Sequence, residues 1–240
     1  MTDKPEIVTV LEDANLAHKA GDFVNALKFY EYFFDHALDD DPYALYGVRL
    51  SYCLQGWADL ALEFPGAKIS LETKKRSILS QYLETKDPER FHDYFTICHH
   101  LGTETDALEQ FLTLHHELPN SAVKLVKYVW DDLINAEQWS VCNDLLLEPS
   151  QKLDELFSVF DEQARLKEVD AEFDNLKFDK HIVDSLLDSI QNVVLVLRHA
   201  NRDDDINALQ RQFNQAIETR HHSRLNTQAH AKSSYLFAGH

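Results

Sequence analysis

Glycine and proline are scarce in this chain, which has six of each among 240 residues. Turn-rich β sandwiches and barrels use many such residues, so their scarcity argues against those folds. Apolar residues make up 44% and charged residues 27% of the chain, as in an ordinary globular protein and unlike a disordered one. The length allows one large domain or two small ones, each with a core of its own.

Cysteine is also rare, and the three cysteines, Cys53, Cys98 and Cys142, lie far apart without a CxxC pair. An odd number cannot pair completely, so we expect buried reduced thiols and a cytoplasmic location. The N-terminal segment lacks the basic start and apolar run of a signal peptide. No stretch approaches the ~18 apolar residues of a membrane span, so no membrane contact is expected.

Basic residues are outnumbered, with 23 Lys and Arg against 41 Asp and Glu and a formal net charge of −18. Such a surface repels phosphate backbones, and we expect no nucleic-acid partner. The charge is uneven, because residues 211–240 hold four basic residues and one acidic residue, which leaves 19 against 40 on the rest. Residues 1–210, with a net charge of −21, would attract a basic partner segment, and salt would weaken that attraction. The alternative is that the excess of acidic residues only keeps the protein soluble.

Apolar residues recur at helical spacing throughout, and no segment alternates as a strand does. Before residue 150 the expected helices are short and punctuated. One runs from about Pro42 to a stop at Gly56, and the next starts at Trp57 and is either kinked or broken at Pro65. After residue 150 the helices lengthen, and stripes over 182–197 and 206–217 predict an antiparallel helical hairpin with a polar turn at 201–203.

A repeat links the first helices. Gly21, Gly56 and Gly102 are each followed by an alanine five residues later, and a weaker fourth unit starts at Glu137. The segment AGDFVNALKFY at 20–30 shows the pattern best: the glycine ends one helix, the alanine allows close approach, and an aromatic residue fills the next gap. Over about residues 7–150 the chain resembles the tetratricopeptide repeat (TPR) family. A generic antiparallel helix bundle is the alternative.

This resemblance implies an all-α fold of stacked antiparallel helix pairs, a TPR-like right-handed solenoid, with the C-terminal helical hairpin added. We expect a repeat region over residues 1–149, a long hairpin over 150–225 that acts as a cap or dimerisation element, and a polar tail over 226–240.

Motifs for catalysis and cofactor binding are missing. There is no GxSxG, GxGxxG, P-loop or HExxH pattern. Thirteen histidines include doublets at 99–100, 115–116 and 221–222, but adjacent helical residues point about 100° apart and do not readily share a metal ion. We therefore expect no enzyme activity, metal or cofactor. A metal site or enzyme built on the His-rich region 92–116 is kept as an alternative hypothesis.

The resemblance implies that the first helix of each pair lines a concave, peptide-binding face. Positions counted back from the repeat anchors give the expected binding residues: Asn15, His18, Tyr46, His92, Thr96, His99, Lys127 and Asp131. The expected function is a non-catalytic interaction module that binds a peptide or helix of a partner protein, and the acidic surface favours a basic partner. A structural homodimer formed through residues 150–225 is a further alternative.

Overall fold

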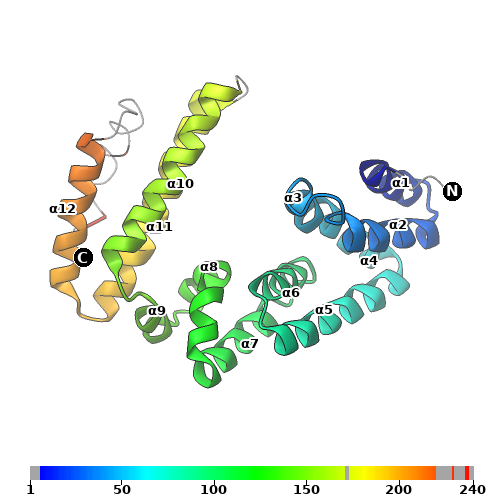
Figure 1. The fold of residues 1–240 in the computed structure, drawn as a ribbon, viewed down its shortest axis with the longest axis horizontal. Coiled ribbons are helices and arrows are strands. Elements are labelled where there is room, and N and C mark those ends of the chain that lie inside the picture. The colour runs from blue at the N-terminus through cyan, green and yellow to red at the C-terminus, as the bar shows by residue number, and fades with distance from the viewer. Residues whose placement is uncertain (1–5, 171–172, 220–228, 230–235, 238–240) are drawn as a thin grey trace. The chain divides into compact units, whose positions relative to one another are not determined.

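The computed structural model describes residues 6–170, 173–219, 229 and 236–237. These residues form helices and turns without a strand, which confirms the all-α prediction (Figure 1). The predicted polar tail 226–240 lies outside the described residues except for residues 229, 236 and 237. None of the described helices combines the length and apolar character that a membrane span requires.

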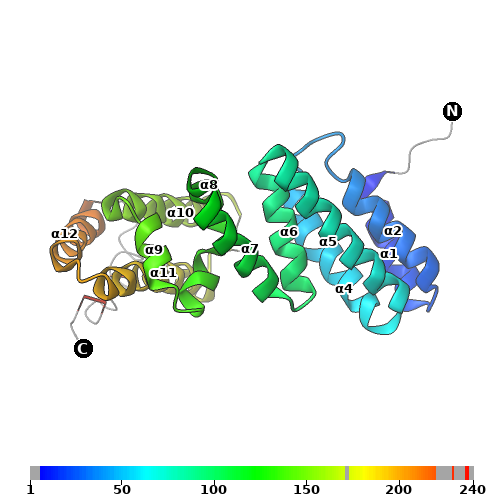
Figure 2. The same ribbon diagram turned by 90° about the horizontal axis from the view of Figure 1, so that it is seen from below.

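The chain divides into two compact units, Met1–Asp132 and Leu133–His240. In the first unit each helix packs mainly on its neighbours in sequence, α1 on α2, α4 on α5, α5 on α6 and α6 on α7, and Figure 2 shows α4, α5 and α6 side by side. Its helices are α1 (Ile7–Lys19), α2 (Phe23–His36), α3 (Tyr46–Val48), the π-helical η1 (Arg49–Cys53), α4 (Leu54–Glu63), α5 (Pro65–Thr85), α6 (Pro88–His100), α7 (Glu104–Glu117) and the part of α8 (Pro119–Asn135) up to residue 132.

Two of the repeat glycines end helices as predicted. Gly21 and Gly102 have φ of 76° and 65°, a region that glycine enters without steric cost. In both turns the glycine N–H bonds the carbonyl three residues back, and the next N–H bonds the carbonyl five back, which is the Schellman arrangement. Glu137, the weaker anchor, has φ of 55° and the same two hydrogen bonds. The repeated glycine pattern thus marks one recurring turn.

The prediction for Gly56 is wrong. The helical run from Tyr46 continues through Gly56 to Glu63, and the break falls at Phe64 and Pro65. A side chain at position 56 would place its Cβ 2.6 Å from the Tyr30 hydroxyl oxygen, so glycine is needed for close helix packing. The open choice at Pro65 is settled as a break, because proline lacks the N–H that a continuous helix requires and is favoured at a helix start.

The second unit contains α9 (Trp139–Leu145), α10 (Pro149–Val169), α11 (Leu176–His199) and α12 (Asp203–Thr219). α11 packs against the other three helices, and α10 also contacts α12. The apolar stripes predicted at 182–197 and 206–217 are buried, and Phe157 of α10 stacks on Phe213 of α12 at 5.9 Å. This unit begins before the predicted domain boundary at residue 149 because α9 packs on α11.

Candidate functional site

Four polar and aromatic side chains from three helices meet in the first unit. Tyr46 begins α3, Glu89 and His92 lie one turn apart on α6, and Tyr128 lies on α8. We call these four residues the Tyr–His–Glu cluster. Their positions span 83 residues of sequence, so the cluster exists only because α3, α6 and α8 lie near one another.

Glu89 is the acceptor at the centre of the cluster. Its carboxylate accepts a short hydrogen bond from the Tyr46 hydroxyl through Oε2 and one of 2.9 Å from the Tyr128 hydroxyl through Oε1. The bond from Tyr46 is the main reason that the pKa of Glu89 is lowered, and the Tyr128 bond and the charge of Lys127 add to it. Glu89 is therefore ionised at neutral pH and has lone pairs left for a further donor.

Both tyrosines remain protonated donors. Burial and the neighbouring Glu89 raise the pKa of Tyr46 and of Tyr128 far above the ordinary value of 10, because a phenolate beside a carboxylate is unfavourable. The single Tyr46 hydrogen goes to Glu89, so the contact of 2.6 Å between the Tyr46 oxygen and His92 Nδ1 needs its hydrogen from the imidazole. His92 therefore carries its proton on Nδ1, and Nε2 is the acceptor atom of the ring.

His92 is neutral at pH 7. Its half-buried position, together with the charges of Lys127 and Arg49, lowers its pKa below the usual 6.5, against the opposing effect of Glu89 and Asp93. The imidazole ring lies parallel to the Tyr128 ring, with centroids 4.2 Å apart and an interplanar angle of 12°. Stacking removes water from both rings, which costs a neutral imidazole little free energy. Burial and ring packing therefore both favour the neutral form of His92.

Lys127 completes the surroundings. Its side chain is exposed, and its ammonium lies 4.6 Å from the centroid of the Tyr128 ring. His92 already covers one face of that ring, so the ammonium takes the other face. Attraction between a cation and the electron-rich face of tyrosine holds Lys127 there.

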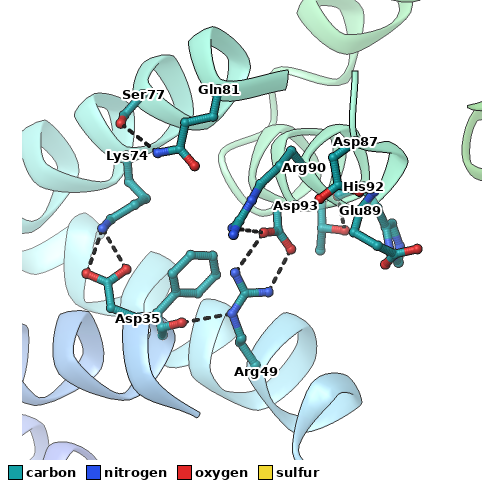
Figure 3. A network of polar contacts seen from close by, with 12 residues as sticks. Asp35, Arg49, Lys74, Ser77, Gln81, Asp87, Glu89, Arg90, His92 and Asp93 are labelled. Carbon is teal, nitrogen blue, oxygen red and sulfur yellow. Dashed lines mark hydrogen bonds and ion pairs between the residues drawn. The ribbon is translucent and has the colours of Figure 1, made fainter. Parts of the chain in front are cut away.

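A buried ion pair between Arg49 and Asp93 lies beside Glu89 and His92 (Figure 3). Arg49 donates to both carboxylate oxygens of Asp93 at 2.6 and 2.8 Å, and its Nε donates to the Phe34 carbonyl at 2.8 Å. Both charged side chains are about 95% buried, and Arg90 adds a longer contact of 3.4 Å to Asp93. Because Arg49 contacts groups on α2 and α6, it fixes the position of η1 between them.

Two small pockets also lie in this unit. One, of about 300 Å³, is lined by Arg49, Lys74 and Arg90, but carboxylates already pair with all three cations, including Asp35 with Lys74 at 2.7 Å (Figure 3). The other, of about 480 Å³, lies between α5 and α7 and has mixed charges, with Lys75 bound to Asp106. Paired charges leave little net attraction for a charged ligand at either place.

Three of the predicted binding residues, Tyr46, His92 and Lys127, are brought together at the cluster. Asn15 instead accepts a hydrogen bond of 2.8 Å from Tyr30, and His18 contacts Glu63 at 3.3 Å. Asn15 thus joins α1 to α2 and His18 joins α1 to α4, away from the cluster residues.

The other predicted residues lie along α6 and α8. The Thr96 hydroxyl bonds the His92 carbonyl within its own helix at 2.8 Å, and His99 contacts Asp132 of α8 at 3.1 Å. Asp131 is exposed next to this contact. The His99–Asp132 contact and the cluster both join α6 to α8, so polar side chains follow the line along which these helices meet.

The count from the repeat anchors missed Glu89 and Tyr128. Glu89 lies one turn before His92, so extending the count by one turn would have found it. Tyr128 follows Lys127 directly, and an error of one residue in the weak anchor at Glu137 is enough to miss it. No sequence signal marked Arg49 as buried, because an isolated arginine is normally exposed.

Chemically, the cluster offers an ionised carboxylate, aromatic ring faces and hydroxyl oxygens, which suit the binding of cations and hydrogen-bond donors. Among the described residues no group of three or more His, Cys, Asp or Glu side chains is arranged to hold a metal ion. The three cysteines are buried core residues, as predicted, and burial raises the pKa of Cys53 to about 12 and of Cys142 to about 11. Such thiols are poor nucleophiles.

Comparisons of the chain with models of known protein families, with curated proteins and with solved structures find no match.

Proposed function

We propose that the first unit is a docking module, which binds a peptide or helical segment of another protein on the face formed by α3, η1, α6 and α8 and catalyses no reaction. The observation that carries this proposal is the Tyr–His–Glu cluster. Three residues expected on a common binding face come from three separate helices, namely Tyr46, His92 and Lys127. Tyr46 contacts His92, His92 stacks on Tyr128, and the Lys127 ammonium lies over the same Tyr128 ring.

The proposal includes the finer architecture. We propose that the helices up to residue 149 form stacked antiparallel pairs, as in a right-handed TPR-like solenoid, followed by a long helical hairpin over residues 150–225. The same Schellman turn at Gly21, Gly102 and Glu137 supports this arrangement, because equal turns produce equal pairing of the helices that they join. The departure at Phe64, where the turn is different, falls in the second pair.

The chemistry of the face supports binding rather than structural use alone. Tyr46, His92 and Tyr128 are only half-buried, while Glu89 and Lys127 are exposed. Tyrosine and histidine side chains bury much apolar area at low entropic cost and still offer hydrogen bonds, which is why tyrosine is frequent at protein interfaces. The cluster is thus an ordered group of rings and polar atoms that a partner reaches without rearranging the core.

A paired comparison of variants tests the proposal. The full-length tagged chain, the cluster variant Tyr46→Ala/Tyr128→Ala and the control variant Tyr32→Ala/Tyr43→Ala are used to capture partners from cell extract. Both variants lose two tyrosines, but Tyr32 and Tyr43 lie outside the cluster. Circular dichroism first establishes that all three proteins are folded.

We expect a partner that the wild type and the control variant bind and the cluster variant loses. Its purified form should bind the cluster variant at least tenfold more weakly than the wild type, as for the loss of an aromatic anchor of about 1.4 kcal/mol or more. Equal capture of every partner by the cluster variant and the wild type would refute the docking face.

A further inference from the structure

Within the described residues, the Glu89 carboxylate has no ion-pair partner. No Lys or Arg of the described part of the chain lies within ion-pair distance of its carboxylate, whose only hydrogen-bond donors there are the hydroxyls of Tyr46 and Tyr128. Lys127 lowers the pKa of Glu89 through its charge, without an ion pair to the carboxylate among the described contacts. An ionised, half-solvated carboxylate held by two tyrosines is thus ordered but not neutralised.

The same place already holds an ammonium group. The Lys127 ammonium lies 4.6 Å from the Tyr128 ring centroid, on the face that His92 leaves open. Lys127 reaches this position from an exposed site on α8, and within the described part of the chain its ammonium makes no hydrogen bond or ion pair. A tyrosine face beside a carboxylate is the environment in which proteins bind ammonium and guanidinium groups.

We propose that the Tyr–His–Glu cluster recognises a basic side chain, lysine or arginine, of the docked partner segment, and that Lys127 occupies this cation position in the free protein and is displaced on binding. The inference rests on the proposed docking function for the source of the basic side chain. It goes beyond that function by naming the chemistry of the partner and by making Lys127 a competitor within the chain.

Charge supports a basic occupant. Residues 1–132 hold 12 Lys and Arg against 23 Asp and Glu, a net charge of −11. Exposed Asp131 follows Lys127 by one helical turn, and Asp132 faces His99 beside it. A basic segment that crosses α6 and α8 would therefore meet acidic side chains beyond the cluster, and its association should weaken as salt rises.

Competition by Lys127 has a consequence opposite to that of an ordinary binding residue. Removing its ammonium frees the Tyr128 face and Glu89, so a basic ligand should bind more tightly. A cation–π contact at an exposed site corresponds to a gain in affinity of about two- to fivefold. Loss of a lysine also makes the unit more acidic, so a control with the same charge change is required. Lys124, exposed one turn earlier on α8, supplies it.

The test uses full-length protein and a defined probe, an acetylated and amidated octapeptide of alternating lysine and glycine. Binding is followed by NMR through the aromatic signals of His92 and Tyr128. A second octapeptide with glutamine in place of lysine gives the neutral reference. The variants are Lys127→Met, Lys124→Met and Glu89→Gln.

We expect saturable shifts of the His92 and Tyr128 signals with the lysine probe and none with the glutamine probe. Lys127→Met should bind the lysine probe about two- to fivefold more tightly than Lys124→Met, and Glu89→Gln about two- to fivefold more weakly than wild type. Equal affinity of the two lysine variants would overturn the competitor role, and shifts that are absent or independent of Glu89 would overturn cation recognition. Because no protein partner takes part, these results are separate from those of the capture experiment.

Discussion

The buried pair of Arg49 and Asp93 gives the sharpest stability prediction. Replacing Asp93 with alanine removes both acceptors of the Arg49 Nη atoms, and Arg49 is left about 95% buried with its charge uncompensated. The remaining bond, from Nε to the Phe34 carbonyl, neutralises no charge. Arg49 cannot escape by losing its proton, because a guanidinium stays charged in proteins.

The expected loss is large. Removal of one partner of a buried ion pair costs about 3–5 kcal/mol of unfolding free energy. For a unit of this size the entropy of unfolding is about 0.3 kcal/mol per kelvin, so the midpoint temperature should fall by roughly 10–17 °C. Replacing both partners with apolar residues, as in Arg49→Met/Asp93→Leu, removes the buried charges together and should cost far less than Asp93→Ala alone.

Urea unfolding of the full-length chain, followed by circular dichroism, measures these differences. Arg90→Met is the matched control, since Arg90 contacts the same carboxylate at 3.4 Å but its side chain is 44% exposed, and its loss should cost less than about 1 kcal/mol. If Asp93→Ala lowered the unfolding free energy as little as Arg90→Met does, the assignment of a buried, uncompensated charge would be wrong. The same holds if the double variant were less stable than Asp93→Ala.

Three further predictions concern single positions. Gly56→Ala should destabilise by about 1–3 kcal/mol in thermal unfolding, although alanine normally favours a helix, because the new Cβ would meet the Tyr30 ring; a gain in stability would contradict the packing explanation. Glu137→Gly should stabilise by about 0.5–1 kcal/mol in urea unfolding and Gly102→Ala should destabilise by about 1–2, since both residues occupy the left-handed region that only glycine adopts freely; changes of equal sign would refute this. The pKa of His92 is lowered in the folded state, so the unfolded state binds a proton at this histidine more readily; the resulting contribution to stability is present above pH 6.5 and is lost as the pH falls through the folded-state pKa. The difference in unfolding free energy between wild type and His92→Gln should therefore shrink over the same pH range. An NMR titration that gives His92 a pKa above 6.5 would exclude this contribution.

Much of the local structure could be predicted from the sequence. Gly21 and Gly102 end helices, and the apolar stripes of α11 and α12 are buried. Each of these features depends on a few residues that are close together in the sequence, so residue type and spacing are enough to predict it. The role of Gly56 was predicted wrongly because glycine is required for two different reasons, a left-handed turn or close contact with another helix. Only the left-handed turn can be recognised from neighbouring residues in the sequence.

The candidate site was harder to predict because its position depends on the lengths of the helices. Counting back from an anchor assumes first helices of equal length, and α1 and α6 each have 13 residues. The run from α3 to α4 extends over 46–63, past its supposed anchor, and includes a π-helical segment. Tyr46 was found because it lies at the start of that run, where its hydroxyl meets His92 of α6.

The ion pair and the cluster are two results of one helix register. Arg49 follows Tyr46 by three residues on one helix, and Asp93 follows His92 by one residue on the other. A bidentate pair fixes both the distance and the rotation of its partners, so the bonds between Arg49 and Asp93 also bring the Tyr46 hydroxyl to His92 Nδ1. The π-helical segment that begins at Arg49 inserts extra backbone there, and such segments turn side chains that a regular helix would direct elsewhere. The buried charges therefore have an effect that their modest net stabilisation does not explain: they fix the relative positions of the helices that carry an exposed group of rings and a carboxylate.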